Sequence, residues 1–264
     1  MEWETVSVEL RPGWAVVTMQ RPKVLNALNR RLRQELVAVL DHLADQEHVR
    51  GLVLTGAGRA FSVGQDLAEM EADYRDGAPQ LGRLVREEYV PMVEALYRFP
   101  KPTLALVHGP AAGGGLSLAL ACDLRVLTAD ATLIPAFIKV GLAPDTGAAY
   151  HAVRQLGYAR ALEWFWSGRA LGADQAQAWG LAHWVAADAE TAWERVATVM
   201  EELSQGPTRA YVEVRRLLHQ VAASPWETAL IWEIEAQDRL GQTEDHREAV
   251  AAFLAKRPPQ FQGR

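Results

Sequence analysis

The stretch HGPAAGGGLSL, residues 108–118, decides the fold of this chain. A run of apolar residues, 103–107, leads into it, and a run rich in alanine and leucine, 116–121, leads out of it. This order predicts a buried strand, a glycine-rich turn and the start of a helix. Glycine has no Cβ, so the backbone at residues 113–115 can take positive φ angles and approach a ligand closely. The unpaired N–H groups of a helix start suit an oxyanion or a phosphate; a tight turn without a ligand is the alternative.

Length and composition are those of an ordinary globular protein. A chain of 264 residues can bury one large core, or a core with a smaller appended domain. Apolar residues at 49% and charged residues at 23% are typical of soluble proteins. The net charge of −6 argues against nucleic acid or an anionic membrane as the main partner. An anionic ligand remains compatible with a few locally placed Lys and Arg side chains.

Several kinds of segment and site are not expected. The first residues, MEWETVSVEL, lack the pattern of a signal peptide, and no apolar run approaches the length of a membrane span. A single cysteine, Cys122, excludes an internal disulfide and is expected to be a small core residue. The seven histidines lack the spacing of a metal site, so we predict no metal. A cytoplasmic location follows as the expectation.

Short strands alternate with helices through the first two-thirds of the chain, which predicts the α/β class. We expect a β-hairpin over residues 6–19, a strand at 51–55 and a helix that begins after the N-cap Asn29. The apolar face of that helix is predicted to contain Leu32, Leu36, Val39, Leu40 and Leu43.

Two further segments do not follow this alternation of strands and helices. Residues 68–82 are acidic and interrupted by glycine and proline, and are either a mobile loop that covers a cleft or a solvated connection. From Ala187 onward, four amphipathic helices are predicted, at 189–204, 208–222, 226–240 and 243–255. We therefore divide the chain into a core, 1–195, and a helical oligomerisation region, 196–264.

Three segments, taken in order, resemble the crotonase, or enoyl-CoA hydratase/isomerase, family. They are GRAFSVGQDL (58–67), HGPAAGGGLSLALACDLRV (108–126) and the block at 141–185 that begins GLAPDTG. The resemblance implies a crotonase-like spiral of ββα turns, a C-terminal helical trimerisation region and a homotrimer or homohexamer. It also implies an acyl-CoA thioester as substrate, with coenzyme A a part of that substrate and no separate cofactor. Within the family, Pro144–Gly147 and Gly64–Leu67 are similar to segments of 1,2-epoxyphenylacetyl-CoA isomerases of phenylacetate degradation.

The resemblance also assigns roles at the glycine turn. By alignment, the backbone N–H groups of Ser62 and Gly114 are those that polarise the thioester carbonyl and stabilise an enolate. The family's hydratases hold water with two glutamates, and the matching positions here are Ser117 and Phe137. Neither side chain can act as a carboxylate base, which argues against hydration.

Asp145 is the carboxylate that remains, since isomerases and a dehalogenase of the family place their acidic residue in this segment. As a base it would take a proton from one carbon of the acyl group and return it two carbons away. This transfer would shift the double bond of an enoyl-CoA, or convert 1,2-epoxyphenylacetyl-CoA to its oxepin form. Four alternatives stay open. Asp145 can serve only as the cap of its helix, or it can be the nucleophile of an aromatic acyl-CoA dehalogenase. The chain can also be an enoyl-CoA hydratase, or a CoA-binding scaffold without activity.

The remaining expected contacts are with the substrate. By resemblance, the residues beside coenzyme A are Lys23, Val24, Leu25, Ala60, Val63, Gly64, Gln65, Asp66 and Leu67. Lys256 and Arg257 are expected to meet CoA phosphates, from the same or a neighbouring subunit, although surface cations are usually only solvated. An apolar pocket for the acyl group is predicted from Phe137, Tyr150, Trp164 and Trp166, which as aromatic residues are otherwise plain core.

Overall fold

The computed structural model describes residues 3–75, 77 and 80–264, with Asp73 described by its backbone alone. Its main sheet has six strands in the order β1-β2-β3-β4-β6-β9. The hairpin of β1 and β2 is antiparallel, and every later pair in this sheet is parallel. The strands of this sheet are β1 (Val6–Arg11), β2 (Trp14–Met19), β3 (Leu52–Gly56), β4 (Thr103–Val107), β6 (Leu124–Thr128) and β9 (Trp184–Ala186).

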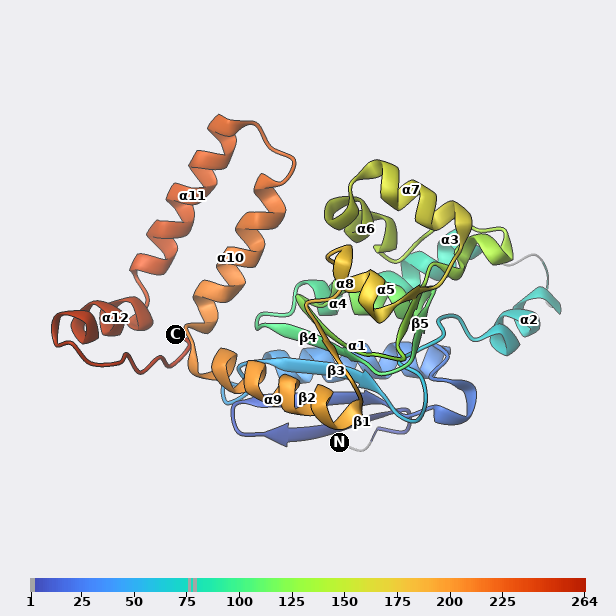
Figure 1. Ribbon diagram of the computed structural model, residues 1–264, viewed down its shortest axis with the longest axis horizontal. Coiled ribbons are helices and arrows are strands. Elements are labelled where there is room, and N and C mark those ends of the chain that lie inside the picture. Colours follow the sequence, from blue (N-terminus) through green and yellow to red (C-terminus); the bar gives the residue numbers. More distant parts are fainter. Residues whose placement is uncertain (1–2, 76, 78–79) are drawn as a thin grey trace.

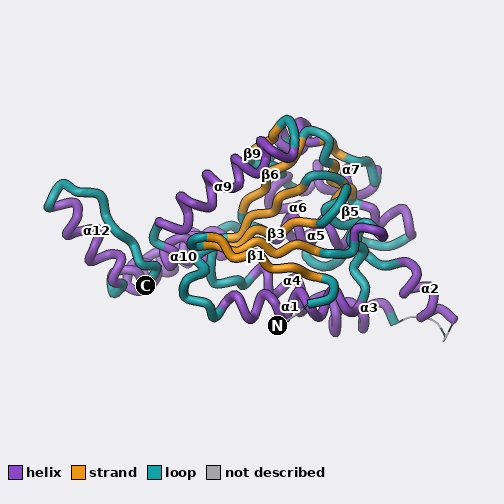
Figure 2. Tube along the Cα trace, turned by 90° about the horizontal axis from the view of Figure 1, so that it is seen from below, coloured by secondary structure: helices purple, strands orange, loops and turns teal. Residues whose placement is uncertain are grey.

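Both faces of the main sheet are covered, so the central strands are nearly continuous apolar runs. Every residue of β3 and β4 is buried. Helices α1 (Arg30–Ala44) and α4 (Val90–Tyr97) lie on one side of the strands, and α9 (Ala189–Gln205) lies on the other (Figure 2). Asn29 caps α1 by accepting a hydrogen bond from the Leu32 N–H at 3.0 Å, and the predicted apolar face of α1 is buried. The hairpin, the N-cap and this apolar face are thus confirmed.

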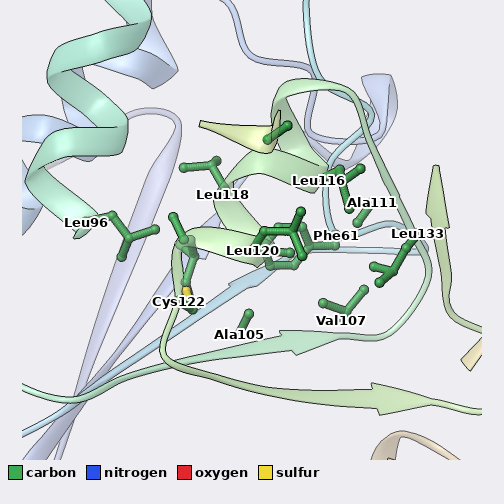
Figure 3. Close-up of a cluster of buried hydrophobic side chains, with 14 of the residues drawn as sticks. Phe61, Leu96, Ala105, Val107, Ala111, Leu116, Leu118, Leu120, Cys122 and Leu133 are labelled. Carbon is green, nitrogen blue, oxygen red and sulfur yellow. The ribbon is translucent and has the colours of Figure 1, made fainter. Parts of the chain in front are cut away.

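Helix α5 (Gly114–Ala121) lies at the centre of the core, and all eight of its residues are buried. Its side chains pack between β4, Phe61 and neighbouring apolar residues (Figure 3). Cys122, at the end of α5, is a buried core residue, as predicted. The turn before α5 contains a short strand, β5 (Pro110–Ala112). This strand belongs to a second, three-stranded sheet with β7 (Thr132–Ile134) and β8 (Leu171–Gly172). The predicted order of strand, glycine turn and helix is confirmed, with a short extra strand inside the turn.

Residues 68–82 are more ordered than a loop where the structure describes them. Helix α2 (Leu67–Arg75) projects from the body, and α3 (Leu81–Leu84) continues through a π-helical turn, η2 (Val85–Tyr89), into α4 (Figure 1). Asp66 begins α2 because its carboxylate accepts the Ala68 N–H at 3.1 Å. Residues 76, 78 and 79 lie outside the described part, so the prediction of a lid is not tested there.

The C-terminal third is helical, as predicted, but its division from the core differs. The predicted boundary at 195 falls inside α9, which is a single helix. Its residues Val196 and Met200 pack against the apolar side chains of the main sheet. The packing changes only after α9, where α10 (Thr208–Val221), α11 (Trp226–Gly241) and α12 (Glu244–Leu254) extend away from the body (Figure 1). The boundary was misplaced because amphipathic periodicity is the same in a helix that covers a sheet and in one that leaves it.

The other helices connect these layers. They are η1 (Pro22–Val24), η3 (Ala136–Val140), α6 (Ala148–Leu156), α7 (Tyr158–Ser167) and α8 (Ala173–Ala178). Among the described residues, no helix combines the length and apolar character that a membrane crossing needs.

Candidate functional site

The glycine turn places a backbone donor at the start of α5. Gly113 has a φ of 52°, in the region that glycine favours, and Gly114 is the first residue of the helix. The Gly113 carbonyl accepts the Ser117 N–H at 3.0 Å, which closes the first helical turn. The N–H of Gly114 belongs to the first turn and therefore has no acceptor within the helix.

The loop after β3 runs directly beside this turn. The Ser62 N–H donates to the Pro110 carbonyl at 3.2 Å, and the Ser62 carbonyl accepts the Ala112 N–H at 2.9 Å. Residue 62 thus forms a bridge with β5, and its N–H is already used. This pairing conflicts with the predicted role of Ser62 as a donor to substrate, because the expectation came from alignment and ignored the bridge.

Gln65 offers the free N–H that Ser62 lacks. Within the described part of the chain, the Gln65 N–H has no hydrogen-bond acceptor. It follows Gly64, which has a φ of 83° and packs so tightly that a Cβ there would lie 2.9 Å from the Gly114 nitrogen. The N–H groups of Gln65 and Gly114 therefore lie on either side of the close contact between the loop after β3 and the start of α5. The positive φ required at Gly64 is the sequence signal that could have indicated the residue after it.

A buried asparagine holds this loop in place. Asn26, fully buried, donates from Nδ2 to the carbonyls of Ala57 at 2.9 Å and Ala60 at 2.8 Å. Its Oδ1 accepts the Arg21 N–H at 2.9 Å. The Arg21 guanidinium in turn pairs with Asp66 at 2.8 Å. Burial opposes ionisation of Asp66, but the hydrogen bond and charge of Arg21, together with the N–H groups of Ala68 and Glu69, outweigh it and lower the pKa of this carboxyl.

Asp145 lies on the loop before α6, close to the first turn of α5. Gly147 is the N-cap residue of α6, and within the described part of the chain no side chain caps this helix. The alternative in which Asp145 serves only as a helix cap is therefore wrong. The Asp145 carboxylate instead accepts a hydrogen bond from Thr146 Oγ1 at 3.0 Å. Burial raises the pKa of Asp145, and the hydrogen bond from Thr146 partly offsets that rise. A carboxyl with a raised pKa is suited to exchange protons with substrate.

Tyr89 is a site residue that the sequence analysis missed. It ends the π-helical turn η2, and a Cβ on Gly114 would lie 3.5 Å from its ring. The Tyr89 hydroxyl hydrogen-bonds to Gln65 Oε1 and receives a hydrogen bond from Arg33 at 3.2 Å. Burial raises the pKa of Tyr89, and the nearby charge of Asp145 adds to the rise. Apolar spacing does not distinguish a π-helical turn from an α-helix, so no sequence pattern indicates that Tyr89 lies at this site.

The aromatic residues predicted to line an acyl pocket are dispersed. Phe137 is buried beside Phe165, with ring centroids 6.3 Å apart. Trp164 is a fully buried core residue, whereas Trp166 is 71% exposed. Tyr150 lies on the surface against Tyr97 and His219. These four side chains therefore do not line one apolar pocket, and the prediction that Tyr150, Trp164 and Trp166 join Phe137 in such a pocket is wrong.

The residues predicted beside coenzyme A fall into two groups. The loops at 23–25 and 60–67 lie together, because the Val63 N–H donates to the Leu25 carbonyl at 3.1 Å and the Leu28 N–H to Gly64 at 2.7 Å. Lys23 and Val24 are exposed there. Lys256 and Arg257 come shortly after α12, and α12 lies on the side of the molecule opposite α2 (Figure 1).

Arg257 has a partner within the chain. It forms a two-pronged ion pair with Glu248, at 2.5 and 2.9 Å, so it is not a free cation in the single chain. As for metals, the described residues contain no group of three or more His, Cys, Asp or Glu side chains that could hold an ion.

Known proteins resemble this chain over its whole length. The model of the enoyl-CoA hydratase/isomerase family matches residues 9–264. A Rhodobacter capsulatus protein named "Probable enoyl-CoA hydratase" is 42% identical over 100% of both chains. The 1,2-epoxyphenylacetyl-CoA isomerase of Escherichia coli is 36% identical over 99% of both.

The three-dimensional comparison agrees with the sequences. A crystal structure from Mycobacterium abscessus, assigned to the same enzyme group, superposes with a TM-score of 0.92 at 38% identity, covering 98% of this chain and 100% of that one. The predicted fold class is therefore confirmed. The chain belongs to the enoyl-CoA hydratase/isomerase family.

Proposed function

We propose that the protein is an acyl-CoA isomerase in which Asp145 moves a proton between two carbons of the acyl group. The observation that carries this proposal is the position of Asp145. Its half-buried carboxyl lies on a loop that packs against the first turn of α5, because Ser117, one helical turn after Gly114, contacts the Asp145 carbonyl at 3.4 Å. A base and an oxyanion site in such proximity are the two parts that enolate chemistry needs.

The reaction would proceed through an enolate. The thioester oxygen accepts hydrogen bonds from the N–H groups of Gln65 and Gly114, which replace the pair of Ser62 and Gly114 expected from alignment. Ionised Asp145 takes a proton from a carbon adjacent to, or conjugated with, the carbonyl. Negative charge then collects on the oxygen, where each backbone donor stabilises the transition state by roughly 2.7–4 kcal/mol. Protonated Asp145 returns the same proton two carbons away, and the double bond shifts.

Hydration fits the site less well, although the Rhodobacter capsulatus protein and other similar proteins are named hydratases. Ser117 is fully buried and Phe137 nearly so, and neither carries a carboxylate to activate water. The similarity to the Escherichia coli enzyme supports 1,2-epoxyphenylacetyl-CoA as a second substrate, on which the same base and the same oxyanion donors would act. In that case Asp145 would take a proton from the carbon next to the thioester, and the negative charge would collect on the thioester oxygen. Return of the same proton to a ring carbon would then accompany opening of the strained epoxide to the oxepin form.

A panel of thioesters tests the proposal. Purified protein is offered trans-3-enoyl-, trans-2-enoyl-, 1,2-epoxyphenylacetyl- and 4-halobenzoyl-CoA, and products are separated by liquid chromatography with mass detection. We expect conversion of the first or the third. Water addition to the trans-2-enoyl thioester as the main reaction would overturn the argument from Ser117 and Phe137. Halide release, with an acyl group trapped on the Asp145 peptide, would make Asp145 a nucleophile instead.

We also propose that α10–α12 join copies of the chain into a trimer or a pair of trimers. These helices expose large apolar side chains that a single chain leaves in water: Trp226, Ile231, Ile234, Val250, Phe253 and Leu254. Exposed apolar area on this scale is typical of an interface. In such an assembly, a neighbouring copy is the route by which Lys256 would reach coenzyme A.

Phe253→Glu tests the assembly. Phe253 is 82% exposed, so the charge adds no strain to the single chain but would be buried without a partner in an oligomer. We expect light scattering to show a mass decrease toward the monomer. Leu10→Glu, at a position 57% exposed on the hairpin, should leave the mass unchanged. A monomeric wild-type protein would contradict the proposal.

A further inference from the structure

We infer that Thr146 and Ser117 form a hydroxyl relay that positions Asp145 and reorients as its carboxyl gains and loses a proton. The inference rests on the proposed function, since it concerns the proton that Asp145 carries. It assigns a task to Ser117, the residue that stands where the family's hydratases have a glutamate.

The geometry of three oxygen atoms carries the inference. Thr146 Oγ1 lies 3.0 Å from Asp145 Oδ1 and 2.6 Å from Ser117 Oγ. Ser117 is fully buried and Thr146 is 5% exposed, so water does not compete for these hydrogen bonds. Ser117 projects from α5, one turn after Gly114, so the relay joins the base to the helix that supplies the oxyanion donor.

The backbone conformation of Thr146 is unfavourable for its residue type, which indicates that the surrounding structure holds this hydroxyl in position. Its φ is +50°, in the left-handed region that a β-branched residue rarely adopts. Glycine would fit that conformation without strain, and Gly147 follows immediately with a φ of 85°. Strained residues of this kind persist where the surroundings hold them, and they cluster at functional sites.

Each hydroxyl has one hydrogen, so the direction of the relay follows the charge of Asp145. When Asp145 is ionised, Thr146 donates to the carboxylate and Ser117 donates to Thr146. When Asp145 is protonated, Thr146 turns to donate to Ser117. Ser117 then donates to the Gly113 carbonyl at 3.3 Å or the Asp145 carbonyl at 3.4 Å. No proton leaves either hydroxyl; only their orientations change.

The other titratable groups around Asp145 do not replace the relay. The charge of Asp145 acts on Tyr89 of η2, whose raised pKa keeps the phenol neutral, and Arg33 beside the Tyr89 ring pairs with Glu69. On α6, His151 lies beside Gly147, and burial lowers its pKa to about 4, so it is neutral near pH 7. Thr146 is thus the side chain that hydrogen-bonds the carboxyl directly.

Three substitutions test the relay in the full-length protein. Thr146→Val keeps the shape and the β-branch but removes the hydroxyl, Thr146→Ser restores it, and Ser117→Ala removes the second hydroxyl. Two quantities are measured. The first is the pH profile of kcat and kcat/KM for the best thioester of the panel. The second is the pKa of Asp145 without substrate, from carbon-13 NMR of labelled aspartate, assigned by comparison with Asp145→Asn.

For Thr146→Val we expect the pKa of Asp145 to rise, because the hydrogen bond that lowers it is gone. The acidic limb of kcat/KM moves to higher pH, and kcat falls roughly tenfold to a hundredfold while KM changes little. Ser117→Ala moves both quantities in the same direction by less, and Thr146→Ser stays within about twofold of wild type.

An unchanged Asp145 resonance pKa in both Thr146→Val and Ser117→Ala would overturn the relay, even in a protein that proves inactive on every thioester. Full activity of Asp145→Asn would instead overturn the proposed function and leave the NMR result to judge the relay. If Thr146→Val does not fold, Ser117→Ala decides by the same two measurements.

Discussion

Asp145→Asn is expected to lower kcat by about 10²- to 10⁴-fold, the range that removal of a general acid–base group produces. The amide has the shape of the carboxyl and can still accept the hydrogen bond from Thr146. It cannot take a proton from carbon at any accessible pH. Steady-state kinetics on the thioester that the wild-type protein converts best would measure the loss, and isothermal titration with the same thioester would show binding retained.

Misfolding cannot account for such a loss. Burial raises the pKa of Asp145, so the ionised group disfavours the folded state at pH 7, and a neutral amide should keep or increase the free energy of unfolding. Asp188→Asn is the matched control. Asp188 caps α9 with the Thr191 N–H at 2.9 Å, and asparagine caps equally well, so activity should be unchanged. Equal activity of Asp145→Asn and wild type would exclude Asp145 as the base.

Gly115→Ala is expected to destabilise the protein by about 3 kcal/mol or more and to lower activity at least ~10²-fold. A Cβ at Gly115 would lie 2.2 Å from the Ser62 carbonyl oxygen, which is backbone and cannot rotate away. In a helix, alanine gains only about 1 kcal/mol over glycine, so the clash decides the sign. The loop would move off α5, and the hydrogen bond between Ser62 and the Ala112 N–H, at 2.9 Å, would lengthen.

Chemical denaturation and kinetics on the same samples would measure both effects. Gly172→Ala is the control, because a Cβ there meets no atom within 4 Å and the residue has an ordinary φ of −71°. Its free energy of unfolding should change by less than about 0.5 kcal/mol. A Gly115→Ala variant as stable and active as Gly172→Ala would show that loop and helix are not in the tight contact described.

Local patterns were sufficient for most of the elements. Asn29 before a run of helical apolar spacing predicted both the start and the buried face of α1. The apolar runs around the glycine turn predicted β4 and α5. The composition of residues 68–82 does not predict α2, because the start of this helix depends on Asp66, which Arg21 holds from another loop.

The sequence by itself determined the α/β class, the glycine turn, the lack of a carboxylate at Ser117 and Phe137, and the presence of Asp145 in the turn of residues 144–147. These follow from residue type and order. Only the tertiary structure decided that Ser62 is bonded to Pro110, that Gln65 keeps a free N–H, and that Thr146 and Ser117 meet Asp145. Which N–H is free depends on the strand that a loop pairs with, and hydroxyls 29 residues apart meet only when α5 and the loop before α6 pack together.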